Sequence, residues 1–188
     1  GELVSTLDSM SGWQPLRITA APTSKMDILY QVKRPTPTTP YAYVKVAEGC
    51  DKTCTFCAIP QFRGKQRSRT PVNIRDEIVD LASQGVGEIV LVAQDLASFG
   101  RDQGVGDRLI VPLARRVAER VDRVRLLYLY PSDLGDDLID AICDTGVPYF
   151  DLSLQHVSPP LMRRMRRWGD GVKFLDRIEA VRRREPDA

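Results

Sequence analysis

Strand-like and helix-like patterns alternate about four times between residue 41 and the last residue of the chain. The run EIVLVA at residues 88–93 is almost wholly apolar, as expected of a strand that is covered on both faces. The other expected strands are residues 41–47, 123–129 and 149–154. This alternation favours an α/β fold in which a parallel sheet carries helices on its outside.

Helix signals separate these strands. Thr70 and Pro71 supply an N-cap hydroxyl followed by a proline in the first turn, and Gly85 ends the helix that they open. The further expected helices are residues 108–121, residues 132–143, a segment that opens at Ser158-Pro159, and residues 172–184. Four strand–helix units are too few to close an eight-stranded barrel, so we expect a partial (β/α) barrel.

The first forty residues have a different character. They are rich in Ser, Thr and Pro with little periodicity, and residues 34–40 are not expected to form regular structure. We interpret residues 1–40 as an irregular linker or remnant leading from a missing N-terminal domain, with a short strand at residues 27–33. Residues 41–188 are then the N-terminal part of a barrel domain, truncated where REPDA follows the last helix.

The composition is that of an ordinary globular protein, with 43% hydrophobic residues, 28% charged residues and a formal net charge of +2. No apolar run approaches the roughly 20 residues of a membrane span, and the N-terminus lacks the features of a signal peptide. We therefore expect a cytoplasmic protein without a membrane partner. In a reducing compartment, clustered thiols are more often metal ligands or catalysts than disulfides.

Three of the four cysteines, Cys50, Cys54 and Cys57, form a CxxxCxxC motif in the loop after the first expected strand. A structural zinc site needs four ligands, and the only histidine, His156, lies far along the chain. A thioredoxin-type pair would leave Cys50 unexplained. Three thiolates on an iron–sulfur cluster would leave one iron open to a substrate or cofactor.

The sequence CDKTCTFC, with Phe56 before the last cysteine, resembles the radical S-adenosylmethionine (SAM) superfamily. The resemblance implies that Cys50, Cys54 and Cys57 hold a 4Fe-4S cluster whose fourth iron is chelated by SAM, and that Phe56 is among the residues that bind the cofactor. It further implies that an electron from the cluster cleaves the sulfonium to give a 5'-deoxyadenosyl radical, which the barrel interior keeps from solvent.

The neighbouring sequence YAYVKVAEGCDKTCTFCAIPQFRGKQRSR is similar to the methylthiotransferase family. Three further stretches, VAQD, YLYP and DLSLQHVSP, resemble its RimO-like members. These enzymes methylthiolate the β-carbon of an aspartate in small-ribosomal-subunit protein twelve. The family also has an N-terminal domain with a second 4Fe-4S cluster, further barrel strands and a C-terminal domain, so we expect this chain to be inactive alone.

Four polar residues lie at the ends of expected strands, at the edge where the cysteine loop should lie. Gln94 and Asp95 follow the second strand, where the resemblance implies contact with the methionine end of SAM; the alternative is a polar cap on the next helix. Ser153 and Gln155 lie at the end of the fourth strand, where the superfamily contacts the ribose or the carboxylate. No catalytic residue is assigned beyond the cluster ligands.

The remaining chemically distinctive residues have less specific interpretations. Cys143 is expected to be a buried structural thiol, and Trp168 to pack at a helix end. His156 is either an acid or base or a satisfied structural group. Basic residues after the cysteine loop either steer carboxylates or form a solvated loop, and most later arginines are expected on outer helix faces. The first group is Arg63, Lys65, Arg67 and Arg69; the second is Arg163, Arg164, Arg166, Arg167 and Arg182 to Arg184.

Two other functions remain open. One is methylthiolation of a tRNA adenosine, and the other is a non-catalytic metal-binding module of the same fold. The expected partners are a ribosomal protein of the small subunit and an electron donor. Direct nucleic-acid binding is not indicated, because aromatic and basic residues do not interleave.

Overall fold

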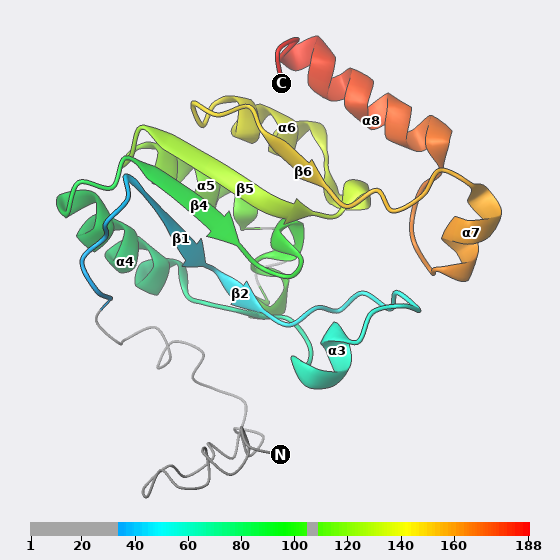
Figure 1. The fold of residues 1–188 in the computed structure, drawn as a ribbon, viewed down its shortest axis with the longest axis horizontal. Helices are drawn as coiled ribbons and strands as arrows, with labels where there is room; N and C mark the ends of the chain where they lie inside the picture. Colours follow the sequence, from blue (N-terminus) through cyan, green and yellow to red (C-terminus); the bar gives the residue numbers. More distant parts are fainter. Residues whose placement is uncertain (1–33, 105–108) are drawn as a thin grey trace, which may run out of the picture.

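The computed structural model describes residues 34–104 and 109–188, and its centre is a four-stranded sheet (Figure 1). Its strands are β1 (Tyr41–Lys45), β4 (Glu88–Val92), β5 (Arg123–Leu129) and β6 (Phe150–Leu152). They lie in the order β1-β4-β5-β6, and every neighbouring pair is parallel. The predicted parallel sheet is confirmed, and within the described residues it remains open rather than closing into a barrel.

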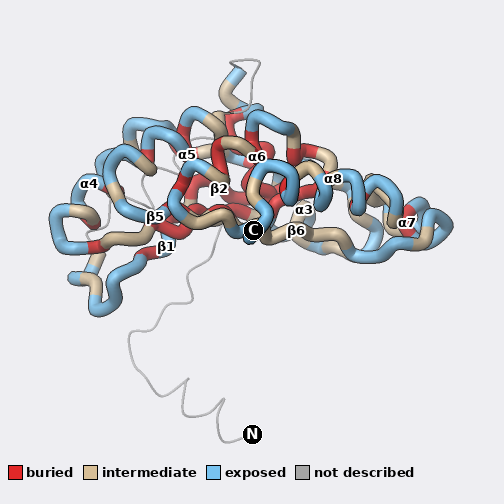
Figure 2. The backbone as a smooth tube through the Cα atoms, turned by 90° about the horizontal axis from the view of Figure 1, so that it is seen from above, coloured by how far each residue is buried: buried red, intermediate tan, exposed pale blue. Residues whose placement is uncertain are grey.

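The four longest helices lie together on one face of this sheet (Figure 2). These helices are α4 (Pro71–Ser83), α5 (Ile110–Ala118), α6 (Asp136–Cys143) and α8 (Gly171–Arg184). Alternate residues of β1, Ala42 and Val44, point to the helices and are buried, whereas Tyr41 and Tyr43 lie on the other face and are exposed. The hydrophobic core therefore fills the layer between sheet and helices.

Helix α4 begins as the sequence predicts. The Thr70 hydroxyl accepts a hydrogen bond from the Asn73 amide, and Pro71 occupies the first turn. Such a cap is worth about 1 kcal/mol. At the other end the chain leaves the helix at Gln84, and Gly85 takes a φ of +90°, a conformation that favours glycine.

Several predicted elements are longer than the observed ones, most clearly residues 108–121, 132–143 and 149–154. In place of one helix over residues 132–143, the structure has a 3-10 turn, η3 (Pro131–Asp133), then a short non-helical segment, and α6 begins at Asp136. The two elements are separate because Lys52 and Arg101 hold the Asp133 side chain. Helix α5 ends at Ala118, and β6 keeps only three residues because its register with β5 shifts. Arg108 and the predicted strand at residues 27–33 lie outside the described residues.

Short elements surround the cysteine loop. They are β2 (Ala47–Glu48), α3 (Ile59–Phe62), β3 (Arg67–Ser68), the 3-10 turns η1 (Leu96–Ser98) and η2 (Arg101–Gln103), and the predicted α7 (Pro159–Arg164). Strands β2 and β3 pair antiparallel, which returns the chain to the sheet edge after the loop. Residues 34–40 contain neither helix nor strand, as expected. Within the described part of the chain, no helix is long and apolar enough to cross a bilayer.

Candidate functional site

The cysteine loop follows β2 at the carboxyl edge of the parallel sheet. Cys50, Cys54 and Cys57 line one cavity there, so the structure brings the three predicted thiols together. Cys50 is buried, and the other two are half-buried. The side chains that line the cavity with them are Lys52, Phe56, Ile59, Gln94, Asp95, Tyr128, Tyr130, Ser153, Gln155 and Arg167.

The three thiols are free and do not form a closed metal site in this conformation. Among residues 34–104 and 109–188, no group of three or more histidine, cysteine or acidic side chains is close enough to hold a metal ion. Burial raises the pKa of the Cys50 thiol, and the charges of Asp95 and the other two cysteines raise it further, against a hydrogen bond from the Lys52 amide. Three soft donors on one irregular loop, facing one cavity, fit a cluster that takes three thiolates.

Gly49 fixes the start of the loop. Its φ is +84°, and a Cβ at this position would lie 2.2 Å from the carbonyl oxygen of Lys65, so only glycine allows this close approach. The Gly49 amide donates to Gln94 Oε1 at 2.8 Å, and the Cys50 amide donates to the Gly64 carbonyl at 3.1 Å. The loop is thus held against both β4 and the chain that returns from α3.

Gln94 and Asp95 lie beside the cysteines, as predicted. Gln94 accepts the bond from Gly49, whereas Asp95 accepts a hydrogen bond from the Ser98 hydroxyl at 2.7 Å and lies 3.6 Å from the Lys52 ammonium. Asp95 is 3% exposed, and burial raises the pKa of its carboxyl. Asp95 stands at the N-cap position of η1, but its side chain accepts no backbone hydrogen bond there, so the capping alternative is not met; both residues line the cavity.

Ser153, Gln155 and Phe56 also line this cavity. The Ser153 amide donates to the Leu129 carbonyl at 3.1 Å, which extends β6 toward the site. Gln155 has a φ of 75°, an uncommon value for a residue other than glycine. Phe56 is 57% exposed, so its ring stands at the surface beside Cys57. The positions of all three agree with the prediction, and their contacts with a cofactor stay a prediction.

Five residues that line the cavity were not predicted, namely Lys52, Ile59, Tyr128, Tyr130 and Arg167. Tyr130 follows β5, and its ring lies between two cations, with Lys52 Nζ 4.2 Å and the Arg167 guanidinium 4.0 Å from its centroid. Arg167 Nη1 is 3.5 Å from Cys54 Sγ. Arg167 is therefore an exception to the outer positions expected for most of the later arginines, because the chain turns back after α7 and carries this side chain into the site.

An ionic network supports the floor of the site. Asp133 accepts hydrogen bonds from Lys52 Nζ and Arg101 Nη2, each at 2.7 Å. Burial alone would raise the pKa of Asp133, but these two cations outweigh it and lower the pKa. In the same way, the loss of hydration at Lys52 is outweighed by Asp133 and Asp95, and its pKa is raised.

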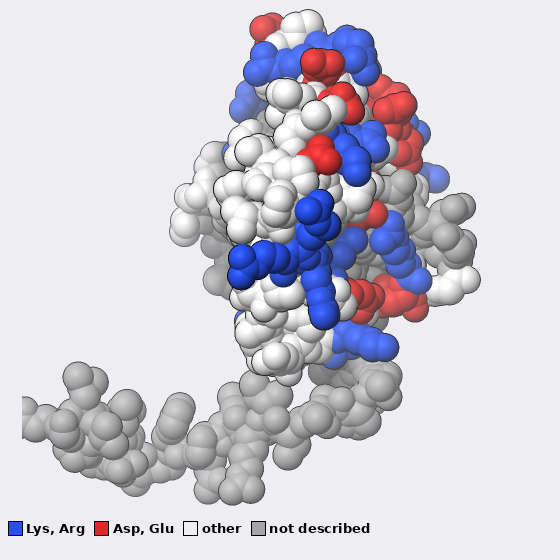
Figure 3. Space-filling view, turned by 90° about the vertical axis from the view of Figure 1, so that its right-hand side faces the viewer, with Lys and Arg blue, Asp and Glu red and all other residues white. Residues whose placement is uncertain are grey.

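The basic run after the loop divides into two kinds of residue. Arg63, Lys65 and Arg67 are exposed, in keeping with either predicted interpretation. Arg69 is fully buried and contacts the Lys45 carbonyl and Glu77, so for this residue both interpretations are wrong. Farther along, Lys and Arg side chains gather on the end of the molecule that carries α7 and α8 (Figure 3), in agreement with the outer positions predicted there.

The structure also shows the surroundings of His156, Trp168 and Cys143. His156 is exposed, and its Nδ1 accepts a hydrogen bond from the Ser158 amide at 2.9 Å, which is a local structural contact. Trp168 packs against Phe174 with ring centroids 6.1 Å apart, as predicted. Cys143 is only partly buried against the core, and burial raises the pKa of its thiol.

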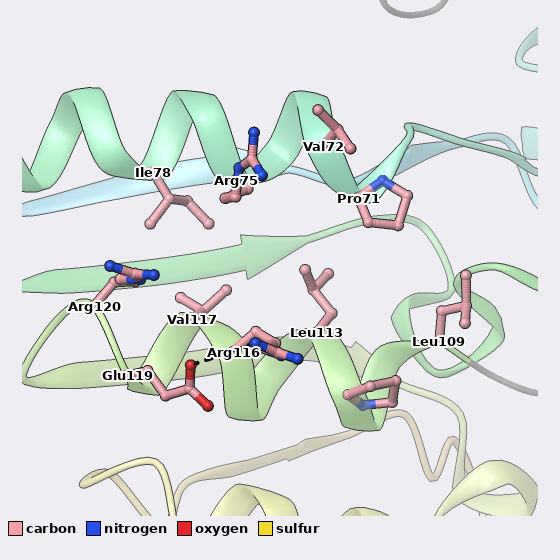
Figure 4. Close-up of a pocket in the computed structure, with 11 residues that line it drawn as sticks. Pro71, Val72, Arg75, Ile78, Leu109, Leu113, Arg116, Val117, Glu119 and Arg120 are labelled. Atoms are coloured by element: carbon pink, nitrogen blue, oxygen red, sulfur yellow. Dashed lines mark ion pairs between the residues drawn. The ribbon is translucent and has the colours of Figure 1, made fainter.

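A second cavity of about 350 Å³ lies between α4 and α5. Figure 4 shows Ile78, Leu113 and Val117 pointing into it, with Arg75 and Arg120 at its rim. It contains none of the predicted site residues and no thiol. Its apolar floor offers no ligands for a metal or cluster, unlike the smaller cavity around the cysteines.

Comparison with known proteins bears on this site. The sequence model of the Radical SAM superfamily matches residues 44–185 of this chain. Proteins named ribosomal protein uS12 methylthiotransferase RimO are 46% identical over 154 residues in Streptomyces coelicolor, 48% over 154 residues in Kineococcus radiotolerans and 44% over 151 residues in Aquifex aeolicus. The matches cover 79% of this chain, and the chain spans about a third of these relatives' length, 31%, 31% and 35%.

Among solved structures, the radical SAM methyltransferase TsrM from Kitasatospora setae has a similar fold, with a TM-score of 0.60 and 17% identity. The similarity covers 77% of this chain and 29% of TsrM. The predicted superfamily resemblance is confirmed: with its CxxxCxxC loop at the carboxyl edge of a parallel sheet, the chain belongs to the radical SAM superfamily, whose members use a 4Fe-4S cluster and SAM.

Proposed function

We propose that this chain is the radical SAM domain of a methylthiotransferase that modifies the β-carbon of an aspartate in ribosomal protein uS12. The observation that carries the proposal is the placement of three free thiols on one loop, facing a cavity that the ends of β4, β5 and β6 also line. Identities of 44 to 48% with proteins named for this activity support the substrate.

In this proposal Cys50, Cys54 and Cys57 bind the cluster, and Gln94 and Ser153 lie where SAM would extend from it. When bound, the cluster supplies the electron for reductive cleavage of SAM. The chain's own residues position these groups. Gln94 fixes the first turn of the cysteine loop through Gly49, and the burial of Asp95 and Cys50 keeps water from this side of the cavity.

Anaerobic reconstitution with iron and sulfide tests the cluster. We expect a brown protein with about four irons per chain and an electron paramagnetic resonance (EPR) signal that SAM perturbs. A colourless protein that binds zinc instead would support the metal-binding module and contradict the proposal. Because three thiolates must converge, we also expect reconstitution to protect the cysteine loop from proteolysis.

The substrate is tested by offering purified uS12 and tRNA in parallel to a protein extended to the length of the RimO relatives. Mass spectrometry should find a methylthio group on an aspartate of uS12 and no methylthio-adenosine in the tRNA. Modified tRNA and unmodified uS12 would favour the tRNA alternative. The reaction also needs a one-electron donor. The proposed ribosomal substrate supports a cytoplasmic location.

A further inference from the structure

The geometry points to Arg167 as a positioning residue that donates a charged hydrogen bond to the Cys54 sulfur and thereby raises the reduction potential of the bound cluster. The inference rests on the proposed function, because it assumes that Cys54 ligates iron. It concerns a residue that the ligand motif does not contain, 113 positions from Cys54 in the sequence.

Three separate elements hold the Arg167 side chain. Its Nη1 donates to Cys54 Sγ at 3.5 Å, and its Nη2 donates to the Ser153 carbonyl after β6. The guanidinium stacks on the Tyr130 ring after β5 at 4.0 Å. A planar guanidinium with contacts on its face and at both terminal nitrogens has little rotational freedom, so its direction toward Cys54 is fixed.

The backbone after α7 aims this side chain. The Arg167 amide donates to the Met162 carbonyl at 2.9 Å and the Arg166 amide to the Arg163 carbonyl at 3.0 Å, while Arg166 takes a φ of 52°. This pair of bonds with a left-handed residue is the Schellman turn that ends many helices. It reverses the chain, and so brings Arg167 back across the carboxyl edge of the sheet.

The same turn binds the cysteine loop directly. The Thr55 amide donates to the Met165 carbonyl at 3.1 Å, and the Thr55 hydroxyl donates to the Arg164 carbonyl at 2.9 Å. Thr55 follows Cys54 in the sequence, so two hydrogen bonds hold the loop beside the sulfur that Arg167 contacts. Loop and turn therefore form one hydrogen-bonded unit.

The charge of Arg167 is not neutralised by a carboxylate. Lys52, the other cation at the cavity, lies within 4 Å of both Asp95 and Asp133. Arg167 forms no ion pair with any side chain in the described ranges, and its Nε is buried without a hydrogen-bond partner. The cysteine loop, with its thiolates bound to the cluster, is thus the anionic group that this guanidinium contacts.

The electrostatic consequence has a definite sign. Reduction adds one negative charge to the cluster and its sulfur ligands. A fixed cation with an N–H directed at one of these sulfurs stabilises the reduced form more than the oxidised form, because the interaction grows with the negative charge. Arg167 should therefore raise the midpoint potential and ease the transfer of an electron from the donor.

The test compares midpoint potentials of the reconstituted chain without SAM, measured by EPR during titration with a chemical reductant. Arg167→Met should lower the midpoint potential. Arg167→Lys keeps the charge but not the two terminal N–H groups of the guanidinium, so its midpoint potential should lie between those of Arg167→Met and the wild type. Arg163→Met, which removes an exposed charge from α7 just before this turn, is the matched control and should leave the potential unchanged.

Two results separate the inference from the proposed function. If wild-type protein assembles the cluster but Arg167→Met keeps the wild-type potential and only weakens SAM binding, Arg167 serves the cofactor alone and the inference is wrong. If the wild-type protein takes up no cluster, the proposed function fails and the inference with it.

A second pair of variants tests the loop contact if Arg167→Met does not fold. Thr55→Val removes the hydroxyl that bonds to Arg164, and Thr55→Ser retains it. Loss of one hydrogen bond should speed release of iron to a chelator roughly fivefold in Thr55→Val. Thr55→Ser should behave as the wild type, and equal release rates in all three proteins would overturn the proposed attachment of the loop to the turn after α7.

Discussion

The ammonium of Lys52 lies 2.7 Å from the carboxylate of Asp133, and this ion pair joins the cysteine loop to the segment after β5. Lys52 stands between Cys50 and Cys54, and 81 residues separate it from Asp133. Arg101 binds the other oxygen of the same carboxylate. The position of the loop over the sheet edge thus depends on an ionic contact as well as on the backbone bonds around Gly49.

The Lys52–Asp133 pair predicts how stability depends on pH. The pKa of Asp133 is lowered by Lys52 and Arg101, so its stabilisation is present above the unfolded value of about 3.9 and is lost as pH falls through the folded pKa. The pKa of Lys52 is raised, so its contribution is lost only as pH rises through that higher value. Asp95 acts in the opposite direction at acid pH, because its raised pKa means that protonation favours the folded state.

We therefore expect Asp133→Asn to lower the melting temperature at neutral pH and to flatten its decline below about pH 4. Thermal unfolding followed by circular dichroism between about pH 2 and 8 measures both effects. Asp176→Asn on the exposed face of α8 is the control and should follow the wild-type curve. An unchanged acid limb in Asp133→Asn would show that the ion pair does not contribute to stability.

A second prediction concerns the four cysteines. Serine replacements at Cys50, Cys54 and Cys57 should each abolish most iron and sulfide incorporation, because a cluster with an open iron has no spare thiolate. Cys143→Ser should keep wild-type iron content, since Cys143 lies at the end of α6 outside the cavity. Iron retained by any of the three loop variants would exclude that cysteine as a ligand.

Local patterns were enough to predict the sheet and the place of the cysteine loop. Apolar runs such as residues 88–93 and the Thr70-Pro71 start depend on neighbours in sequence, and each was found where expected. Because parallel strands end at a common edge, Gln94 and Ser153 could be assigned to the cavity before their contacts were known.

The remaining features depend on contacts between distant residues. Arg167 and Arg69 each lie in runs of basic residues whose other members are exposed, and nothing local distinguishes them. Arg167 enters the site only because the chain reverses after α7, and Arg69 is buried only because Glu77 and the Lys45 carbonyl surround it. The break before α6 has the same cause, since partners from two other segments hold Asp133.

A third prediction uses two glycines with almost the same backbone conformation. Gly49 and Gly85 have φ values of +84° and +90°, but a Cβ at Gly49 would meet the Lys65 carbonyl oxygen at 2.2 Å, whereas nothing lies within 4 Å at Gly85. Gly85→Ala should cost about 1–2 kcal/mol of unfolding free energy from backbone strain alone. Gly49→Ala should cost a further 1–3 kcal/mol, roughly, because the backbone must move.

Urea unfolding measures this difference, and the unfolded-state effect of alanine is the same at both sites. Gly49→Ala should also reduce iron incorporation, because the shift would displace Cys50. Equal stability losses in the two variants would mean that the loop relaxes freely around Gly49.

The last prediction concerns the buried guanidinium of Arg69, which joins β1 to α4. Its Nη1 lies 2.6 Å from both the Lys45 carbonyl oxygen and Glu77 Oε2, with no exposed surface. Arg69→Met leaves the Glu77 carboxylate without this partner and should cost about 3–5 kcal/mol of unfolding free energy. The control Arg75→Met removes a 62% exposed arginine of α4, the helix that follows Arg69, and should cost less than about 1 kcal/mol. Because Arg69 also follows the strand that leads back from the cysteine loop, Arg69→Met should lower iron incorporation as well. A stability loss no greater than that of Arg75→Met would show that the buried contacts of Arg69 are replaced by water.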